Sequence, residues 1–156
     1  MQLTKHFSIR EFTHSSTAIR LGINNTLPAI LVGNAIATCN MLERIREHLS
    51  SLANKDIPII VNSGYRCLPL NRSLKSSDKS HHVTAEAVDF EAPAFGSPTD
   101  ICVALAPMVG VLKIGQLINE YPDRSGWVHV STKLPEKLMN RIITIKEYST
   151  YIGIVK

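Results

Sequence analysis

Two segments of the sequence are most informative about the fold: SHHVTAEAVDF at residues 80–90 and WVHVS at residues 127–131. Both alternate small or β-branched residues with polar ones, a pattern typical of strands. Side chains of a strand alternate between two faces, so His129 turns away from the core when its two valine neighbours turn toward it. Asp89 stands among apolar residues, where burying a lone carboxylate is costly unless a cation or metal accompanies it.

The remaining sequence predicts helices first and strands later. A capping box at 8–11 begins a short helix, and apolar residues three or four apart predict a long amphipathic helix from about 29 to 53. Ser97 followed by Pro98 predicts another helix start, and that helix should end between 107 and 110. Strands are expected at 57–63 (buried), 84–90, 114–120, 126–132 and, finally, 142–146. We expect one domain spanning residues 1–156 with an α+β fold, its N-terminal helices packed on a mainly antiparallel sheet.

The two strands at 114–120 and 126–132 are joined by a short loop, which predicts an antiparallel hairpin. If Glu120 pairs with Trp127, then Ile118 faces His129 and Gln116 faces Ser131. The side chains of 116, 118 and 120 then share the face of His129. A slip of one residue would reverse this arrangement.

Two imidazoles and one carboxylate in these strand-like settings form a candidate catalytic zinc site. Such sites supply three protein ligands of nitrogen or oxygen and leave a fourth position to water, and His82, Asp89 and His129 fit that count. Peptide hydrolysis at zinc also needs a carboxylate that moves protons. Glu120 is the first candidate for this base and Asp123 the second.

Other residues are candidates for holding a substrate. Arg66 follows the strand at 57–63 and offers a bidentate guanidinium for a carboxylate or oxyanion, while Ser80 and Trp127 are candidate substrate-binding residues and His81 is a candidate pocket residue. Plainer interpretations stay open: Arg66 as a turn residue that pairs with a nearby acid, Glu120 as a solvated strand end, and Trp127 as core.

Composition excludes several classes of protein. The apolar and charged fractions, 44% and 19%, are those of an ordinary globular chain. The apolar stretch 101–118 is interrupted by Pro107 and Lys113, so no membrane span is predicted, and the first residues lack a secretory signal. The net charge of +4 favours anionic polymers, but no Lys or Arg run exceeds two residues, so nucleic-acid binding is not expected. Three cysteines without a Cys-x-x-Cys spacing are expected to be reduced.

Several motifs together resemble the zinc D-alanyl-D-alanine carboxypeptidase family, and more narrowly its short phage and prophage members. They are SGYR at 63–66, S-x-H-x-x-A-x-A-x-D at 80–89 and WVHVS at 127–131. The opening at 3–23 and QLINE at 116–120 are similar to those phage proteins as well. The resemblance extends to about Ile145.

This resemblance implies the fold shared by D-Ala-D-Ala peptidases and the hedgehog domain. It also implies that His82, Asp89 and His129 bind Zn²⁺ and that Arg66 positions the substrate. The implied activity is that of a peptidoglycan peptidase, a D,D-carboxypeptidase or endopeptidase on stem peptides, acting as a phage or prophage endolysin. It would be made in the host cytoplasm, act as a monomer, and reach the wall after release through a separate pore. The alternative is a non-catalytic, zinc-containing binding module of the same fold.

The chain departs from the family at three positions. Ala85 stands where the family usually has glycine, and Cys67 follows Arg66 where serine is common. Many members carry the catalytic acid three residues before the last histidine ligand, and here that position is Gly126. The base must therefore come from elsewhere, and Glu120 on the neighbouring strand is the candidate.

Overall fold

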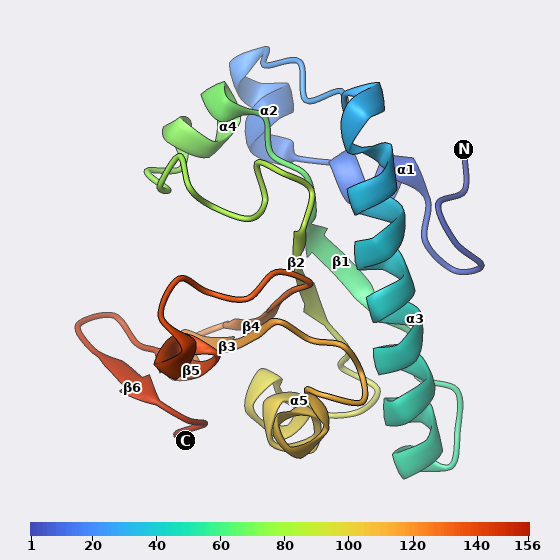
Figure 1. The fold of residues 1–156 in the computed structure, drawn as a ribbon, viewed down its shortest axis with the longest axis vertical. Helices are drawn as coiled ribbons and strands as arrows, with labels where there is room; N and C mark the ends of the chain where they lie inside the picture. The colour runs from blue at the N-terminus through green and yellow to red at the C-terminus, as the bar shows by residue number, and fades with distance from the viewer.

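A mixed sheet of six strands forms the centre of the molecule, as the computed structural model of residues 1–156 shows (Figure 1). The long helix α3 runs along one side of the sheet, α5 lies near its lower end, and the short helices α1, α2 and α4 gather at the upper end (Figure 1). The helices are α1 (Ile9–Thr13), α2 (Ser16–Leu21), α3 (Val32–Ala53), α4 (Leu68–Ser73) and α5 (Pro98–Leu105). The strands are β1 (Ile60–Ser63), β2 (Ala87–Glu91), β3 (Gln116–Glu120), β4 (Trp127–Ser131), β5 (Ile142–Ile145) and β6 (Thr150–Ile152). The fold is therefore of the α+β class.

The strand order is β1-β2-β4-β3-β5-β6. Strands β3 and β4 form the expected antiparallel hairpin, in the expected register: Glu120 pairs with Trp127 and Ile118 with His129. Strand β5 runs parallel to β3, because the segment after β4 crosses over before it joins the sheet, so the sheet is mixed. The central pair β2 and β4 places Asp89 directly opposite His129.

Local signals fix the helix starts. Ser8 and Glu11 form a reciprocal capping box at α1, and Ser97 caps α5 with Pro98 at its first position, both as predicted. Helix α3 follows a short 3-10 turn at Ala29–Leu31 and ends at Asn54, whose left-handed conformation closes the helix.

One hydrophobic core joins α3 to the sheet. Leu42, Ile45 and Leu49 of α3 are completely buried, as are Val128 and Val130 on the inner face of β4. Burying each such side chain stabilises the fold by roughly 1.5–3 kcal/mol. Because these valines face the core, His129 between them must face the other side of the sheet.

Three strand predictions need correction. The strand expected at 57–63 is β1, which starts only at Ile60, and that residue is half exposed because β1 is an edge strand. The strand expected from Thr84 begins at Ala87, because Ala85 adopts a left-handed conformation (φ 59°) that ends a turn. The strand expected to be the last is followed by β6, which is exposed along its length and so lacks an alternating pattern.

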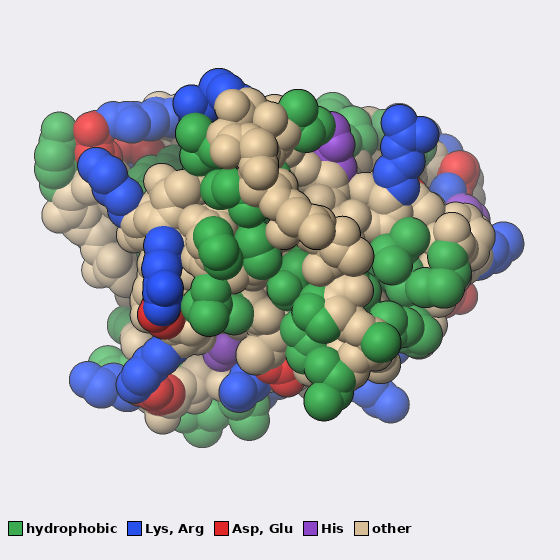
Figure 2. Space-filling model, turned by 90° about the horizontal axis from the view of Figure 1, so that it is seen from above, with side chains coloured by type: hydrophobic (Ala, Val, Ile, Leu, Met, Phe, Trp, Pro, Cys, Tyr) green, Lys and Arg blue, Asp and Glu red, His purple; other side chains and the backbone are tan.

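Charged side chains are spread over the upper face of the molecule. Figure 2 shows the upper end of the molecule, where Lys and Arg side chains lie apart from one another, with uncharged and hydrophobic side chains between them. None of the helices is both long enough and apolar enough to cross a membrane.

Candidate metal centre

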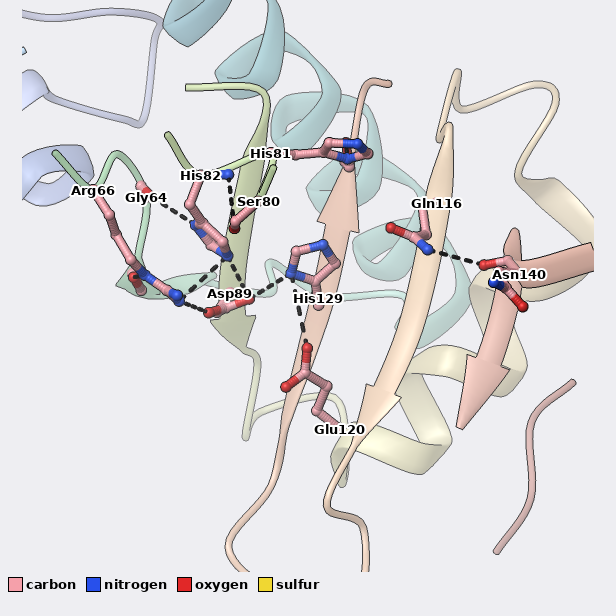
Figure 3. A network of polar contacts seen from close by, with 12 residues as sticks. Gly64, Arg66, Ser80, His81, His82, Asp89, Gln116, Glu120, His129 and Asn140 are labelled. Carbon is pink, nitrogen blue, oxygen red and sulfur yellow. Dashed lines mark hydrogen bonds and ion pairs between the residues drawn. The ribbon is translucent and has the colours of Figure 1, made fainter. Parts of the chain in front are cut away.

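Three side chains from separate segments converge at the upper end of the sheet. His82 lies in the turn before β2, Asp89 in β2 and His129 in β4, and all three are buried. One ligand atom from each lies within 4.8 Å of the others. Figure 3 shows the two imidazoles and the carboxylate pointing toward a common point.

The hydrogen bonds orient each donor atom. The Nδ1 of His82 donates to the carbonyl oxygen of Gly64 at 2.7 Å, so its Nε2 carries the lone pair, which accepts from a guanidinium nitrogen of Arg66 at 3.3 Å. That Nε2 lies 3.2 Å from Asp89 Oδ1, and the Nδ1 of His129 lies 2.8 Å from the same oxygen. The three converging atoms are therefore His82 Nε2, Asp89 Oδ1 and His129 Nδ1.

The donor set fits a divalent transition metal. Donors around a tetrahedral zinc ion lie about 3.3 Å apart, because the bonds to nitrogen and oxygen are about 2.0–2.1 Å long. The contacts of 3.2 and 2.8 Å that Asp89 makes with the two histidines are close to that spacing. A backbone carbonyl that accepts from the outer nitrogen of a histidine, as Gly64 does here, is also usual at such sites. The three residues could thus hold a metal ion.

Asp89 is ionised despite its burial. Desolvation alone would raise the pKa of this carboxyl, but the neighbouring imidazoles of His82 and His129 outweigh it and hold the pKa well below its usual range. The carboxylate thus favours cationic neighbours, as expected from the sequence for an aspartate among apolar residues.

Arg66 supplies one such neighbour. Its guanidinium donates to Asp89 Oδ2 at 2.5 Å and to Ser63 Oγ at 2.8 Å, while Oδ1 of Asp89 faces the histidines. The sequence left open whether Arg66 pairs with a nearby acid, and the structure shows that it pairs with Asp89. Arg66 also lies in the wall of the cavity at this site.

Glu120 extends the cluster from β3. Its carboxylate lies 4.0 Å from the Nδ1 of His129, and only 18% of the side chain is exposed. Burial first, and then the negative charge of Asp89, raise the pKa of Glu120 to about 7, against the opposing influence of His129 and Arg66. A carboxyl with such a pKa can both accept and release a proton near neutrality.

Gly126 explains why the acid is not found three residues before His129. A Cβ atom at this position would lie 2.2 Å from the carbonyl oxygen of Glu120 and 2.5 Å from that of Tyr121, so no side chain fits there. Asp123, the second candidate for the base, is in the hairpin loop and is absent from the residues that line the cavity.

A cavity of about 630 Å³ opens over the cluster. Ser80 and Trp127, both predicted from the sequence, line it together with the three donors, Arg66 and Glu120. The indole N–H of Trp127 is buried without a hydrogen-bond partner, and its ring packs against Tyr121 with the centroids 5.4 Å apart. Cys67 is not among the residues that line the cavity.

Several residues that shape the site were missed by the sequence reasoning. The side chain of Asn25 bonds the carbonyls of Thr13 and Tyr65 and the N–H of Cys67, which fixes the segment that carries Arg66. The rim residues 14–17, which comprise the link after α1 and the first residues of α2, line the same cavity. The sequence indicates only a turn around Asn25, and no motif distinguishes its wider role.

Comparison with protein families finds a match that covers most of the chain. The family model Peptidase M15 matches residues 5–131, which include all three donors, Arg66 and Glu120. The chain belongs to this family, the zinc D-Ala-D-Ala carboxypeptidase family that the motifs resemble, and membership indicates a metallopeptidase. A search among curated proteins finds no match for this chain.

Proposed function

We propose that the protein is a zinc peptidase that cleaves peptide bonds in the stem peptides of peptidoglycan. The observation that carries the proposal is the buried cluster of His82, Asp89 and His129 with the protonatable Glu120 beside it, in a chain of the M15 family. Zinc is the metal that best suits two imidazoles and one carboxylate.

The three donors would hold the ion, which when bound polarises a carbonyl and makes water more acidic. Glu120 then acts as the general base and acid. It takes the proton of the attacking water and returns it to the nitrogen of the leaving amine, so its pKa near neutrality serves both steps.

Arg66 and the cavity walls position the substrate. The guanidinium of Arg66 is fixed by Ser63 and Asp89, so it needs no reorganisation when a substrate carbonyl or carboxylate approaches. Its positive charge also favours the ionised form of Asp89, which preserves that ligand for the metal. Ser80 and Trp127 border the space in which the peptide would lie.

We further propose that the protein is a phage or prophage endolysin that acts on the host cell wall as a monomer. The motifs at 3–23 and 116–120, which resemble short phage members of the family, support this role. The net charge of +4 would favour contact with anionic envelope polymers.

Digestion of purified peptidoglycan, with the fragments weighed by mass spectrometry, tests the function. We expect zinc-loaded protein to release stem-peptide fragments and a chelator to abolish their release. Glu120→Gln should keep the metal but lose at least about a hundredfold in activity, because general acid–base catalysis contributes roughly that much. Glu47→Gln, at an exposed position of α3, is the matched control. Retained metal with no cleavage by the unaltered protein would favour the non-catalytic module instead.

A further inference from the structure

The cavity over the metal centre continues past His129 along the sheet. Ser80 and His129 line a second hollow together with His81 and Gln116. Beyond these, a larger hollow of about 1000 Å³ lies between residues 77–84 and 133–140. The hollows share His81 and Gln116, so they form one cleft that leads away from the cluster.

The opposite side of the cluster is open too. The rim residues 14–17 line the central cavity, and His14 and Ser15 also line the next hollow, which continues along α2. The metal centre therefore lies in the middle of a cleft that has room for a chain on both sides.

Gln116 presents a fixed acceptor to the cleft. Its Nε2 donates to the carbonyl oxygen of Asn140 at 3.0 Å, and because a carbonyl can only accept, this bond decides which way the amide points. The Oε1 is left without a partner, and Figure 3 shows it on the side that faces His129. By register, Gln116 is the diagonal neighbour of His129 on the same face of the hairpin.

His81 is fixed on the other side of this hollow. Its Nδ1 lies 2.7 Å from the hydroxyl of Ser131, the residue paired with Gln116. The Nε2 of His81 forms no hydrogen bond within the protein, so it is free for a ligand. The Oε1 of Gln116 and the Nε2 of His81 are thus two polar atoms in fixed positions. They lie one residue pair of the sheet away from His129, and they can bind the amide groups of a peptide main chain.

We propose that Gln116 and His81 form a subsite that binds the peptide main chain beyond the scissile bond, so that the protein cleaves an internal bond of an extended or cross-linked stem peptide. The inference rests on the proposed peptidase function. A carboxypeptidase would instead need a cleft that closes next to the scissile bond, whereas this cleft stays open on both sides of the cluster. Gln116 is a positioning residue in this scheme, and it takes no part in proton transfer.

Two substrates separate the outcomes: a monomeric stem pentapeptide and a cross-linked stem dimer. We expect zinc-loaded protein to cut the dimer at an internal bond with kcat/KM at least about tenfold above that for trimming the pentapeptide. Removal of only a terminal residue from both, at equal rates, would overturn the inference and leave the peptidase function standing. Cleavage of neither would refute the function itself, and the inference with it.

The variant Gln116→Met removes the acceptor and keeps the size of the side chain. Loss of one hydrogen bond should raise KM for the dimer roughly three- to tenfold with kcat little changed. The dissociation constant of the dimer from the metal-free protein, measured by calorimetry, should rise by the same factor. Gln2→Met, at an exposed N-terminal position, is the matched control. An unchanged dissociation constant, or an equal loss on both substrates, would overturn the subsite.

If Gln116→Met is poorly folded, His81→Phe keeps the bulk of the ring and removes the free nitrogen. The same rise in the dissociation constant of the dimer is expected for it, and no rise would count against the subsite.

Discussion

The charge of Glu120 should destabilise the metal-free protein, and this can be measured without any substrate. The pKa of Glu120 is about 7 in the fold against its usual value of 4.5. A pKa difference of one between the folded and unfolded states corresponds to about 1.4 kcal/mol, so ionising this carboxyl in the folded state costs about 3 kcal/mol. The side chain is 18% exposed, so solvent screens little of this cost.

The sign follows from proton binding. Because the folded state holds the Glu120 proton more tightly than the unfolded state, the free energy of unfolding falls as the pH rises from about 4.5 to about 7. Below this window both states are protonated and the cost is absent; above it the full cost remains. Glu120→Gln mimics the protonated form at every pH, so it should be more stable than the unaltered protein by about 3 kcal/mol at pH 8 and nearly equal to it at pH 4.5.

Urea unfolding in the presence of a chelator, at both pH values, measures this difference. Other groups titrate in both proteins, so comparing the two isolates Glu120, and Glu47→Gln controls for the loss of one negative charge. Added zinc should shrink the advantage of Glu120→Gln, because a divalent cation favours the carboxylate. An advantage that is the same at both pH values would refute the electrostatic reasoning.

Three further substitutions test the packing and the ligands. Asp89→Asn should abolish zinc binding in a titration and cost about 3 kcal/mol in urea unfolding, because it leaves the guanidinium of Arg66 buried without its counter-ion; retained zinc would contradict the ligand assignment. Ala85→Gly should lower the free energy of unfolding by at least about 1 kcal/mol less than Ala35→Gly does in the buried face of α3. The reason is that glycine relieves the left-handed conformation at 85, whereas it weakens the helix at 35. Equal losses of stability in urea unfolding would argue against strain at 85. Gly126→Ala should lower the melting temperature and the activity together, because its Cβ would overlap two backbone carbonyls; unchanged values would show that the hairpin loop relaxes easily.

Features that depend on residues close together in the sequence, such as strand alternation and helix caps, were predicted correctly. The hairpin register from Glu120 to Trp127 was predictable because valines alternate with polar residues in β4, and a slip would have buried the polar set. The capping box of α1 needs only residues three apart, and it too is confirmed. The convergence of His82, Asp89 and His129 was predicted from the cost of burying an aspartate and from the family motifs.

Features that depend on long-range contacts could not be predicted. Strand β6 is exposed and pairs only with β5, so its sequence carries no burial pattern. The bond from Gln116 to the carbonyl of Asn140 depends on the crossover that brings β5 beside β3. The left-handed turn at Ala85 lies in a sequence that otherwise suits a strand, and the backbone bonds that close it, from Ala85 to His82 and from Glu86 to His81, leave no distinctive turn motif in the sequence.

The central claim, one metal ion held by His82, Asp89 and His129, is tested most directly by X-ray absorption at the zinc edge on the purified protein. We expect one zinc per chain, with nitrogen and oxygen neighbours at about 2.0–2.1 Å, and loss of that signal in His82→Ala. Protein that retains no zinc after supply of the ion, or zinc with a sulfur neighbour near roughly 2.3 Å, would contradict it.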